Sequence, residues 1–290
     1  MAIQLAKEFS GEIVSADSRQ VYRQMDVGTA KPSAEEMSGV RHHLIDIVVP
    51  NENFGLAEYQ TLAYKAIKDI QARGKLPLLV GGTGQYVWAV VEGWEVPKVA
   101  PNAEFRKALE ERAKRGEGVS LYQELSMVDP DAARAIDPRN VRRVIRALEV
   151  SSATSKPFSH LRTKKPPDFE TLMIGLSEDR RSLYGHIDAR VDSMIEAGLV
   201  EEVRGLVANG YRLDLPAMSG IGYKQVGEYL TGKLDLGSAI GQIKTETHRF
   251  VRHQYSWFRL SDQRIRWFDT GKPNIATEVF AEVQKFIDRS

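Results

Sequence analysis

The sequence of 290 residues contains no cysteine, which excludes disulfide bonds and thiolate metal sites. It also has no long hydrophobic run, since an apolar stretch such as Leu76 to Val80 is far shorter than the roughly 20 residues that a membrane-spanning helix needs. The N-terminal residues, with acidic Glu8 among them, lack the apolar segment and small-residue cleavage site of a signal peptide. We therefore expect a cytoplasmic protein with no membrane attachment.

An excess of one charge is also absent, because 40 basic and 39 acidic residues give a net charge of +1. The total charge therefore predicts no particular partner, but its distribution is uneven. Between residues 134 and 165 only Asp137 and Glu149 are acidic, whereas the basic residues are Arg134, Arg139, Arg142, Arg143, Arg146, Lys156, Arg162, Lys164 and Lys165. Such a segment can bind a polyanion, or it can be a solvated helix face with a charged loop. Charge alone slightly favours the second interpretation.

Strand and helix patterns alternate along the first hundred residues. Residues 12–16, 43–48 and 76–80 are short apolar segments typical of buried strands, while residues 56–73 have helical periodicity and end at Gly74. A helix is also expected after Gly84. Strands that alternate with helices at these lengths predict an α/β fold, with a parallel sheet covered by helices.

The pattern becomes helical after Val96 and Pro97. We expect a helical insertion over residues 99–139 and an α/β core over residues 1–98 and 140–290. Within the second part of the core, strands are expected at residues 171–176 and 265–268. Helices are expected around residues 183–209, 222–230, 238–260 and 274–287.

Two candidate catalytic elements follow predicted strands. Asp17 stands where the first strand ends, and ligands in parallel sheets bind at the carboxyl ends of strands, so its carboxylate is placed for general-base work. A helix N-cap or turn aspartate is the alternative. Residues 81–84, Gly-Gly-Thr-Gly, follow the strand at 76–80 and could admit a phosphate close to the backbone. Tight turns use glycine without any ligand, so that alternative stays open as well.

Two basic segments are candidates for nucleic-acid contact. Arg139, Arg142, Arg143 and Arg146 have the spacing of one helix face, and no acidic residue interrupts that stripe, which favours phosphate recognition over a solvated face. A second helix carries the basic residues Lys244, His248, Arg249, Arg252 and His253. Ile243, Phe250 and Trp257 recur there every seven residues and are expected in the core. The two histidines are more often surface or packing residues than ligands, but basic residues beside aromatic ones suit RNA.

Several ungapped motifs resemble those of the tRNA dimethylallyltransferase family, also called the tRNA isopentenyltransferases. They lie in the same order over essentially the whole chain. The matching segments are residues 15–22 (SADSRQVY), 25–32 (MDVGTAKP), 42–46 (HHLID), 78–84 (LLVGGTG), 143–150 (RVIRALEV), 220–225 (GIGYKQ) and 252–259 (RHQYSWFR).

This resemblance implies a P-loop-NTPase-like parallel sheet with a helical insertion. It implies transfer of a dimethylallyl group from dimethylallyl diphosphate to N6 of the adenosine 3′ to a tRNA anticodon. Asp17 would be the general base, and Thr83 would lie beside the acceptor amine. Gly81, Gly82 and Lys224 would bind diphosphate. The residues expected to contact tRNA are Asp17, Ser18, Arg19, Gln20, Arg106, Arg142, Arg143, Arg146, His248, Arg249, Arg252 and His253.

The family also carries a Gly-x-x-x-x-Gly-Lys-Ser/Thr loop shortly before the position of Ala2 to Phe9, and this sequence has none. That loop supplies a diphosphate cradle, a lysine and a hydroxyl for Mg²⁺. The resemblance thus implies Mg²⁺ as a cofactor, although no metal ligand is identifiable in the sequence. We expect a sequence truncated before this loop, poor binding of allyl diphosphate, slow turnover and a monomeric state.

Three alternatives to a tRNA-modifying enzyme remain. One is a related prenyltransferase that acts on free adenine nucleotides, which does not need two separate arginine-bearing surfaces. Another is a nucleotide kinase with a P-loop core. The third is a tRNA-binding protein without catalysis, which predicts salt-sensitive affinity for tRNA with no product.

Overall fold

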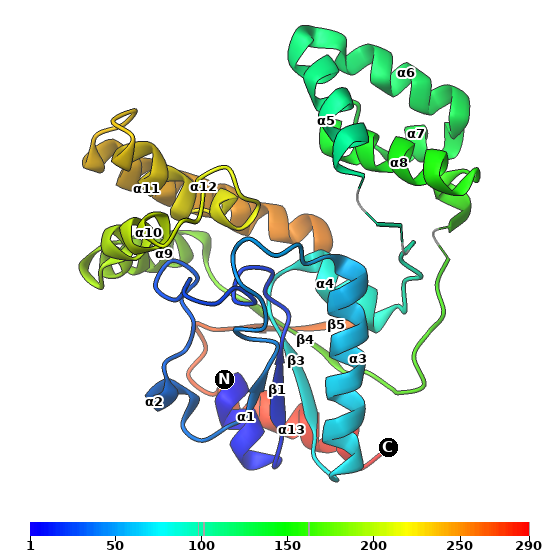
Figure 1. Cartoon of the computed structure of the whole chain (residues 1–290). Helices are drawn as coiled ribbons and strands as arrows, with labels where there is room; N and C mark the ends of the chain where they lie inside the picture. Colours follow the sequence, from blue (N-terminus) through cyan, green and yellow to red (C-terminus); the bar gives the residue numbers. More distant parts are fainter. Residues whose placement is uncertain (98, 101, 162, 290) are drawn as a thin grey trace. The chain divides into compact units, whose positions relative to one another are not determined.

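A computed structural model describes residues 1–97, 99–100, 102–161 and 163–289 of the chain. The chain divides into two compact units (Figure 1). The core unit comprises Met1–Val90 and Asp168–Ser290, and the helical unit comprises Val91–Pro167.

Parallel strands form the centre of the core unit. Strands β2 (His42–His43), β1 (Glu12–Ser15) and β3 (Pro77–Val80) form one sheet in that order, and β4 (Met173–Ser177) pairs with β5 (Ile265–Asp269) in another. In the first sheet Ile13 pairs with His42 on one side and with Leu78 on the other. Every pairing between these strands is parallel, which confirms the predicted α/β class.

Helices cover these strands, and their apolar faces pack against apolar side chains of the strands. Helices α1 (Ala2–Glu8) and α13 (Ile275–Ile287) pack around Leu5, Val279 and Val283, against side chains from β3, β4 and β5. Helix α3 (Leu56–Ala72) reaches β1 through Tyr59, whose hydroxyl donates to the carbonyl of Ser15 at 3.1 Å. Helix α4 (Gly84–Val91) follows β3 directly.

A second apolar cluster holds four further helices of the core unit together. Helices α9 (Arg180–Glu196), α10 (Leu199–Ala208), α11 (Tyr223–Leu230) and α12 (Leu236–Trp257) lie close together (Figure 1). Their apolar faces enclose Tyr22 and Met25, which come from the loop after β1. The packing of Tyr22 and Met25 against these helices therefore holds the loop after β1 in place.

The prediction of a strand over residues 43–48 is wrong. Within the described part of the chain, the strand that pairs with β1 here, β2, covers His42–His43. Leu44 and Asp46 adopt positive φ angles of 64° and 56°, which turn the backbone out of the strand. Ile47 and Val48 still donate to the carbonyl of Val21, so this stretch supports the loop after β1 instead of extending the sheet.

The helical unit is larger than the insertion expected at residues 99–139. It contains α5 (Ala103–Arg112), α6 (Gly118–Val128), α7 (Pro130–Ala135) and α8 (Val141–Thr154). The segment Ala113–Glu117 between α5 and α6 is kinked at Gly116, whose φ is 91°. Residues 140–167, which were expected in the core, belong to this unit. The physical reason is that Val144, Ile145 and Leu148 of α8 pack with Leu121 and Leu125 of α6 in one apolar cluster.

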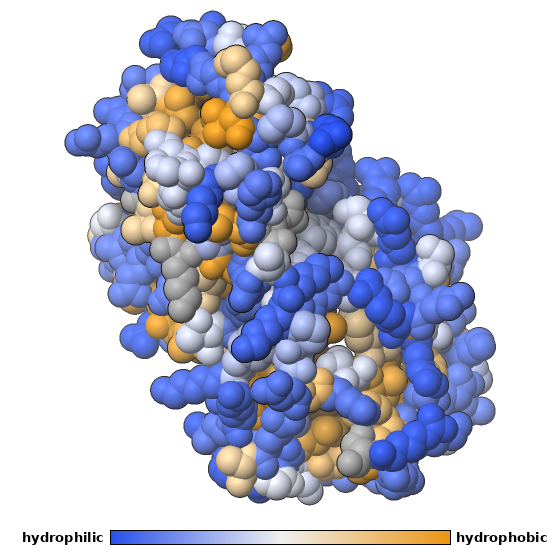
Figure 2. All heavy atoms as spheres, turned by 90° about the vertical axis from the view of Figure 1, so that its right-hand side faces the viewer, coloured by the Kyte–Doolittle hydropathy of each residue, from blue (hydrophilic) through white to orange (hydrophobic). Residues whose placement is uncertain are grey.

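Hydrophilic residues cover most of the face drawn in Figure 2, and the apolar patches on that face are broken up by them. Within the described part of the chain, no helix combines the length and the apolar composition that crossing a membrane requires.

Candidate active site and nucleic-acid contacts

The ends of β1 and β3 bring Asp17 and Thr83 into one place. The backbone N–H of Ala16 donates to the carbonyl of Val80 at 2.7 Å, and the N–H of Thr83 donates back to the carbonyl of Ala16 at 3.2 Å. The N–H of Ser18 then donates to Oγ1 of Thr83 at 3.0 Å. Hydrogen bonds on either side of Asp17 therefore join the ends of β1 and β3 at the carboxyl edge of the sheet.

One oxygen of the Asp17 carboxylate shapes its own turn. Oδ1 accepts hydrogen bonds from the backbone N–H groups of Arg19 at 2.7 Å and Gln20 at 3.3 Å. Among the residues that the structure describes, none donates to Oδ2. The turn-aspartate interpretation of Asp17 is thus correct for Oδ1, while Oδ2 takes no part in the hydrogen bonds of the turn.

The glycine turn at residues 81–84 has structural reasons of its own. A Cβ atom on Gly81 would lie 2.4 Å from the carbonyl of Ala16, and one on Gly84 would lie 2.2 Å from the Trp257 side chain. The amide of Gln254 donates to the carbonyl of Gly82 at 3.3 Å. Close packing therefore requires glycine at residues 81 and 84 whether or not a ligand binds there. Gln254 lies in the family-like segment at residues 252–259, but no spacing in the sequence predicted this contact.

A pair of buried tyrosines lies near the Asp17 loop, and no sequence motif predicted it. The rings of Tyr59 and Tyr86 stack with centroids 3.7 Å apart. Burial raises the pKa of both hydroxyls, and the negative charge of Asp17 raises both further. Both tyrosines therefore remain protonated at neutral pH.

The side chains of Arg19 and Gln20 are used within the protein. The guanidinium of Arg19 donates to the carbonyls of Pro216 at 2.9 Å and Ala217 at 3.2 Å. The amide of Gln20 donates to the carbonyls of Thr29 and Ala30, each at 3.3 Å. These contacts fix the loop at Arg19 and Gln20.

Lys224 was expected near the glycine turn. Its side chain is exposed, and its ammonium lies 3.9 Å from the carboxylate of Glu228 on the next turn of α11. In the described part of the chain no hydrogen bond or ion pair joins it to Gly81 or Gly82. Its backbone N–H donates to the carbonyl of Gly220, a residue near the Arg19 side chain.

The prediction of a continuous arginine stripe over residues 139–146 is wrong in part. Helix α8 begins at Val141, so Arg139 precedes it, and its side chain is 89% exposed and paired with Asp137 at 2.6 Å. Hydrogen bonds from Arg139 lower the pKa of Asp137 to about 2. Asp137 and Asn140 break the helix register before Val141, because Asn140 caps α8 through the N–H of Arg143.

A buried acidic residue also compensates part of the predicted stripe. The Glu149 side chain is 2% exposed, and it accepts hydrogen bonds from Arg146 at 2.6 Å and from Arg106 at 2.8 Å. Burial alone would raise the pKa of Glu149, but these two guanidiniums hold it below its usual value. Arg142 and Arg143 have no such partner among the described residues, so they are the two open guanidiniums of α8.

Some basic residues of α12 have acidic partners and others have none among the described residues. The imidazole of His248 stacks on Tyr184 at 4.0 Å and lies 2.9 Å from Asp188, and Arg249 pairs with Glu246 at 2.5 Å. The side chains of Arg252 and His253 have no partner among the described residues. Phe250 is 46% exposed, so the prediction that it lies in the core is wrong.

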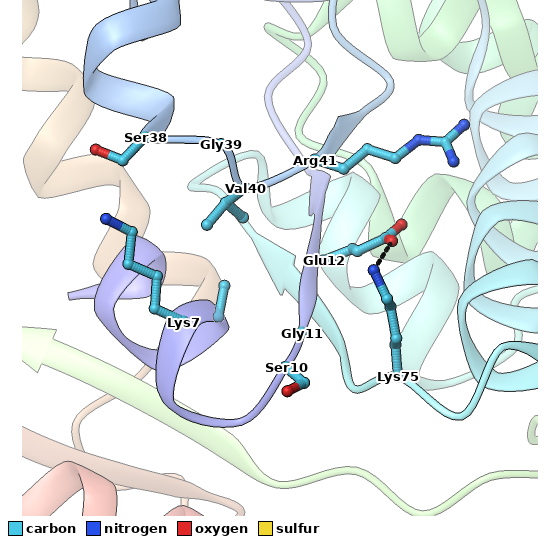
Figure 3. Close-up of a pocket in the computed structure, with 10 residues that line it drawn as sticks. Lys7, Ser10, Gly11, Glu12, Ser38, Gly39, Val40, Arg41 and Lys75 are labelled. Atoms are coloured by element: carbon cyan, nitrogen blue, oxygen red, sulfur yellow. Dashed lines mark hydrogen bonds and ion pairs between the residues drawn. The ribbon is translucent and has the colours of Figure 1, made fainter.

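A cavity of about 360 Å³ lies at the other end of the sheet (Figure 3). Its lining includes Lys7, Ser10, Val40 and Lys75, and the ammonium of Lys75 is held by Glu12 at 2.9 Å. Because Glu12 begins β1 and Asp17 follows its end, this cavity is not part of the Asp17 site. Within the described residues, no three His, Asp or Glu side chains are placed to share a metal ion.

The chain is similar to known proteins in sequence and in fold. The sequence profile of the IPP transferase family matches residues 20–261. A tRNA dimethylallyltransferase of Roseiflexus sp. (strain RS-1) is 54% identical over 259 residues, which cover 89% of this chain and 85% of the relative.

Two solved structures are also similar. The tRNA isopentenylpyrophosphate transferase of Bacillus halodurans is 42% identical, with a TM-score of 0.70 over 99% of this chain and 90% of that one. A eukaryotic dimethylallyltransferase acting on tRNA is 28% identical, with a TM-score of 0.84 over 99% of this chain and 76% of that one. These structures confirm the predicted P-loop-NTPase-like fold. With a profile that matches most of its length and a relative 54% identical, the chain belongs to the IPP transferase family.

Proposed function

We propose that this protein transfers a dimethylallyl group from dimethylallyl diphosphate to N6 of the adenosine that follows a tRNA anticodon on its 3′ side. The bond between C1 of the donor and the diphosphate oxygen breaks, and its electron pair leaves with diphosphate. A bond forms between N6 and C1, and N6 loses one proton. The observation that carries this proposal is the junction of Asp17, Ser18 and Thr83 at neighbouring strand ends.

Asp17 is the proposed proton acceptor. The N6 lone pair of adenine is delocalised into the ring, so a base that takes the proton as the new bond forms lowers the barrier. General-base assistance of this kind is typically worth about 10²–10⁴-fold. Two backbone N–H groups hold Oδ1, and this leaves Oδ2 to receive the proton.

Thr83 is proposed to lie beside the acceptor amine. Its Oγ1 accepts from the N–H of Ser18 and donates to the Ser18 hydroxyl at 3.3 Å, so its position is fixed by the same turn that holds Asp17. A hydroxyl can both donate and accept, which suits an amine that becomes positively charged and then loses a proton.

The leaving diphosphate requires positive charge and N–H donors around it. We assign this role to the backbone at Gly81 and Gly82 and to the exposed ammonium of Lys224. The family resemblance adds Mg²⁺, whose usual contribution is to neutralise diphosphate oxygens. The described side chains do not form a magnesium site by themselves.

We expect residues of both units to contact tRNA. Arg142 and Arg143 of the helical unit and Arg252 and His253 of the core unit have no protein partner in the described part of the chain, and we expect them to meet phosphates. Arg106, Arg146, His248 and Arg249 already have acidic partners, so we expect weaker individual contributions from them. The target base must leave its stack to reach Asp17, which costs a few kcal/mol.

The test is mass spectrometry of nucleosides after incubation with dimethylallyl diphosphate, with enzyme in excess over an unmodified tRNA transcript. We expect one dimethylallyl group on the adenosine 3′ to the anticodon. Parallel reactions contain AMP, or a transcript with that adenosine replaced by guanosine. Modification of AMP but not of tRNA would contradict the proposal, and so would complete absence of product.

A further inference from the structure

The carboxylate of Glu202, on α10, binds three consecutive backbone N–H groups of the loop after β1. Its Oε2 accepts from Asp26 and from Val27, each at 2.7 Å, and its Oε1 accepts from Gly28 at 3.1 Å. The hydroxyl of Tyr223 donates to Oε1 at 2.5 Å. Four donors therefore converge on one side chain of a neighbouring helix.

The residue types at this junction are strongly constrained. A Cβ atom on Gly28 would lie 2.5 Å from the ring of Tyr223, so only glycine lets the loop approach this closely. Burial, and then the charge of Glu202, raise the pKa of Tyr223, so its hydroxyl stays a donor at neutral pH. Hydrogen bonds to a charged acceptor are roughly twice as strong as neutral ones, which suits a carboxylate here.

A continuous set of hydrogen bonds leads from this junction to Asp17. The N–H of Ala30 donates to the carbonyl of Val27 at 3.0 Å and closes the turn that Glu202 holds. The side chain of Gln20 donates to the carbonyls of Thr29 and Ala30, each at 3.3 Å. The backbone N–H of Gln20 in turn donates to Oδ1 of Asp17 at 3.3 Å.

We propose that Glu202 is a positioning residue for the transfer reaction: it fixes the turn at residues 26–30, which through Gln20 sets the orientation of the Asp17 carboxylate. This inference rests on the proposed function. Misplacement of a reacting group by about 1 Å can reduce a rate by about 10²-fold. We therefore expect a rate loss of about 10- to 100-fold when the junction is broken, without loss of tRNA affinity.

The variant is Glu202→Gln, in which an NH₂ group replaces one of the two acceptor oxygens and faces a backbone N–H. The matched control is Glu201→Gln, which removes the same charge from the adjacent position, where Glu201 is exposed and lies 3.4 Å from Arg204. Hydrogen exchange of the backbone amides reads the position of the loop without any reaction. We expect faster exchange at residues 26–28 and also at residues 18–20 in Glu202→Gln, and no change in Glu201→Gln.

Two exchange results would overturn the inference. One is faster exchange at residues 26–28 alone, because the effect would then not reach Asp17. The other is faster exchange throughout β1 and α10, because that would indicate general loss of stability.

The second measurement is the single-turnover rate per folded molecule, in the wild type and in Asp17→Asn. If Glu202 acts through Asp17, adding Glu202→Gln to Asp17→Asn lowers the rate no further, whereas independent roles multiply. Multiplied effects, or a wild-type rate in Glu202→Gln, would reject the positioning role. Absence of product from the wild type would instead reject the proposed function. The exchange result would still show whether Glu202 fixes the loop that carries Asp17.

Discussion

The carbonyl of Ala16 lies 2.4 Å from the place that a Cβ atom on Gly81 would occupy, so the end of β3 touches the backbone that leads into Asp17. A methyl group at residue 81 must push the two strand ends apart. We expect Gly81→Ala to lower the free energy of unfolding by about 1–3 kcal/mol, as overpacking typically does. We also expect it to slow transfer, since Thr83 and Asp17 separate; urea denaturation and the nucleoside assay measure the two effects.

The control for this substitution is Gly241→Ala on α12, where nothing lies within 4 Å of the added carbon. Alanine is favoured over glycine inside a helix, so this variant should be unchanged or stabilised by up to about 1 kcal/mol. Equal stability of Gly81→Ala and Gly241→Ala would mean that the strand ends are not in close contact.

Removing the charge of Asp17 should separate catalysis from binding. Asparagine keeps a carbonyl oxygen for the N–H groups of Arg19 and Gln20, so the turn is preserved. Without a proton acceptor, we expect Asp17→Asn to transfer about 10²–10⁴-fold more slowly. Its dissociation constant for tRNA, measured by filter binding, should stay within about twofold of the wild type. A rate close to that of the wild type would remove Asp17 from the mechanism.

The meeting of Asp17 and Thr83 could be predicted from sequence because each follows a recognisable parallel strand. The carboxyl ends of neighbouring parallel strands lie at one edge of a sheet, whatever the loops do. The support that Glu202 gives to Asp26 and that Gln254 gives to Gly82 joins residues 176 and 172 positions apart in the chain, whose approach is set by packing. No local pattern contains that information.

The arginine stripe shows the opposite case. Periodicity correctly placed Arg142, Arg143 and Arg146 on one helix, but it could not show that Glu149 is buried beneath Arg146 and Arg106. It also extended the helix through Arg139, because the spacing continues although the Asn140 cap stops the backbone. Partners of charged residues follow from burial, which the order of residues does not specify.

Salt dependence should distinguish the open arginines of α8 from the paired ones. We expect Arg143→Ala to weaken tRNA binding and to reduce the slope of log affinity against log salt by about 1, the effect of one lost phosphate contact. Arg139→Ala is the matched control, since Arg139 is bound to Asp137 and should change the slope less. The measurement is filter binding between 50 and 300 mM salt, concentrations on the order of those where such slopes are resolved. Identical slopes for both variants and the wild type would exclude a phosphate contact at Arg143.

The amino end of β1 should make stability depend on acid pH. The side chain of Glu12 is 2% exposed and forms ion pairs with Arg73 and with Lys75, the latter at 2.9 Å, and a hydrogen bond with the imidazole of His43 at 2.7 Å. Hydrogen bonding from Arg73 is the main reason that the pKa of Glu12 lies well below its ordinary value of 4.5, although burial opposes the shift. The unfolded chain therefore binds a proton at a higher pH than the folded protein does.

This difference contributes stability that is fully present above about pH 4.5 and is lost as the pH falls below that value. One proton taken up on unfolding gives a slope of up to about 1.4 kcal/mol per pH unit. We expect Glu12→Gln to be less stable at neutral pH and to show a smaller loss of stability in acid. Glu8→Gln, which alters an exposed glutamate on α1, should keep the wild-type slope in urea denaturation. If Glu12→Gln and the wild type lose stability in parallel as the pH is lowered, the Glu12 ion pairs do not stabilise the folded protein.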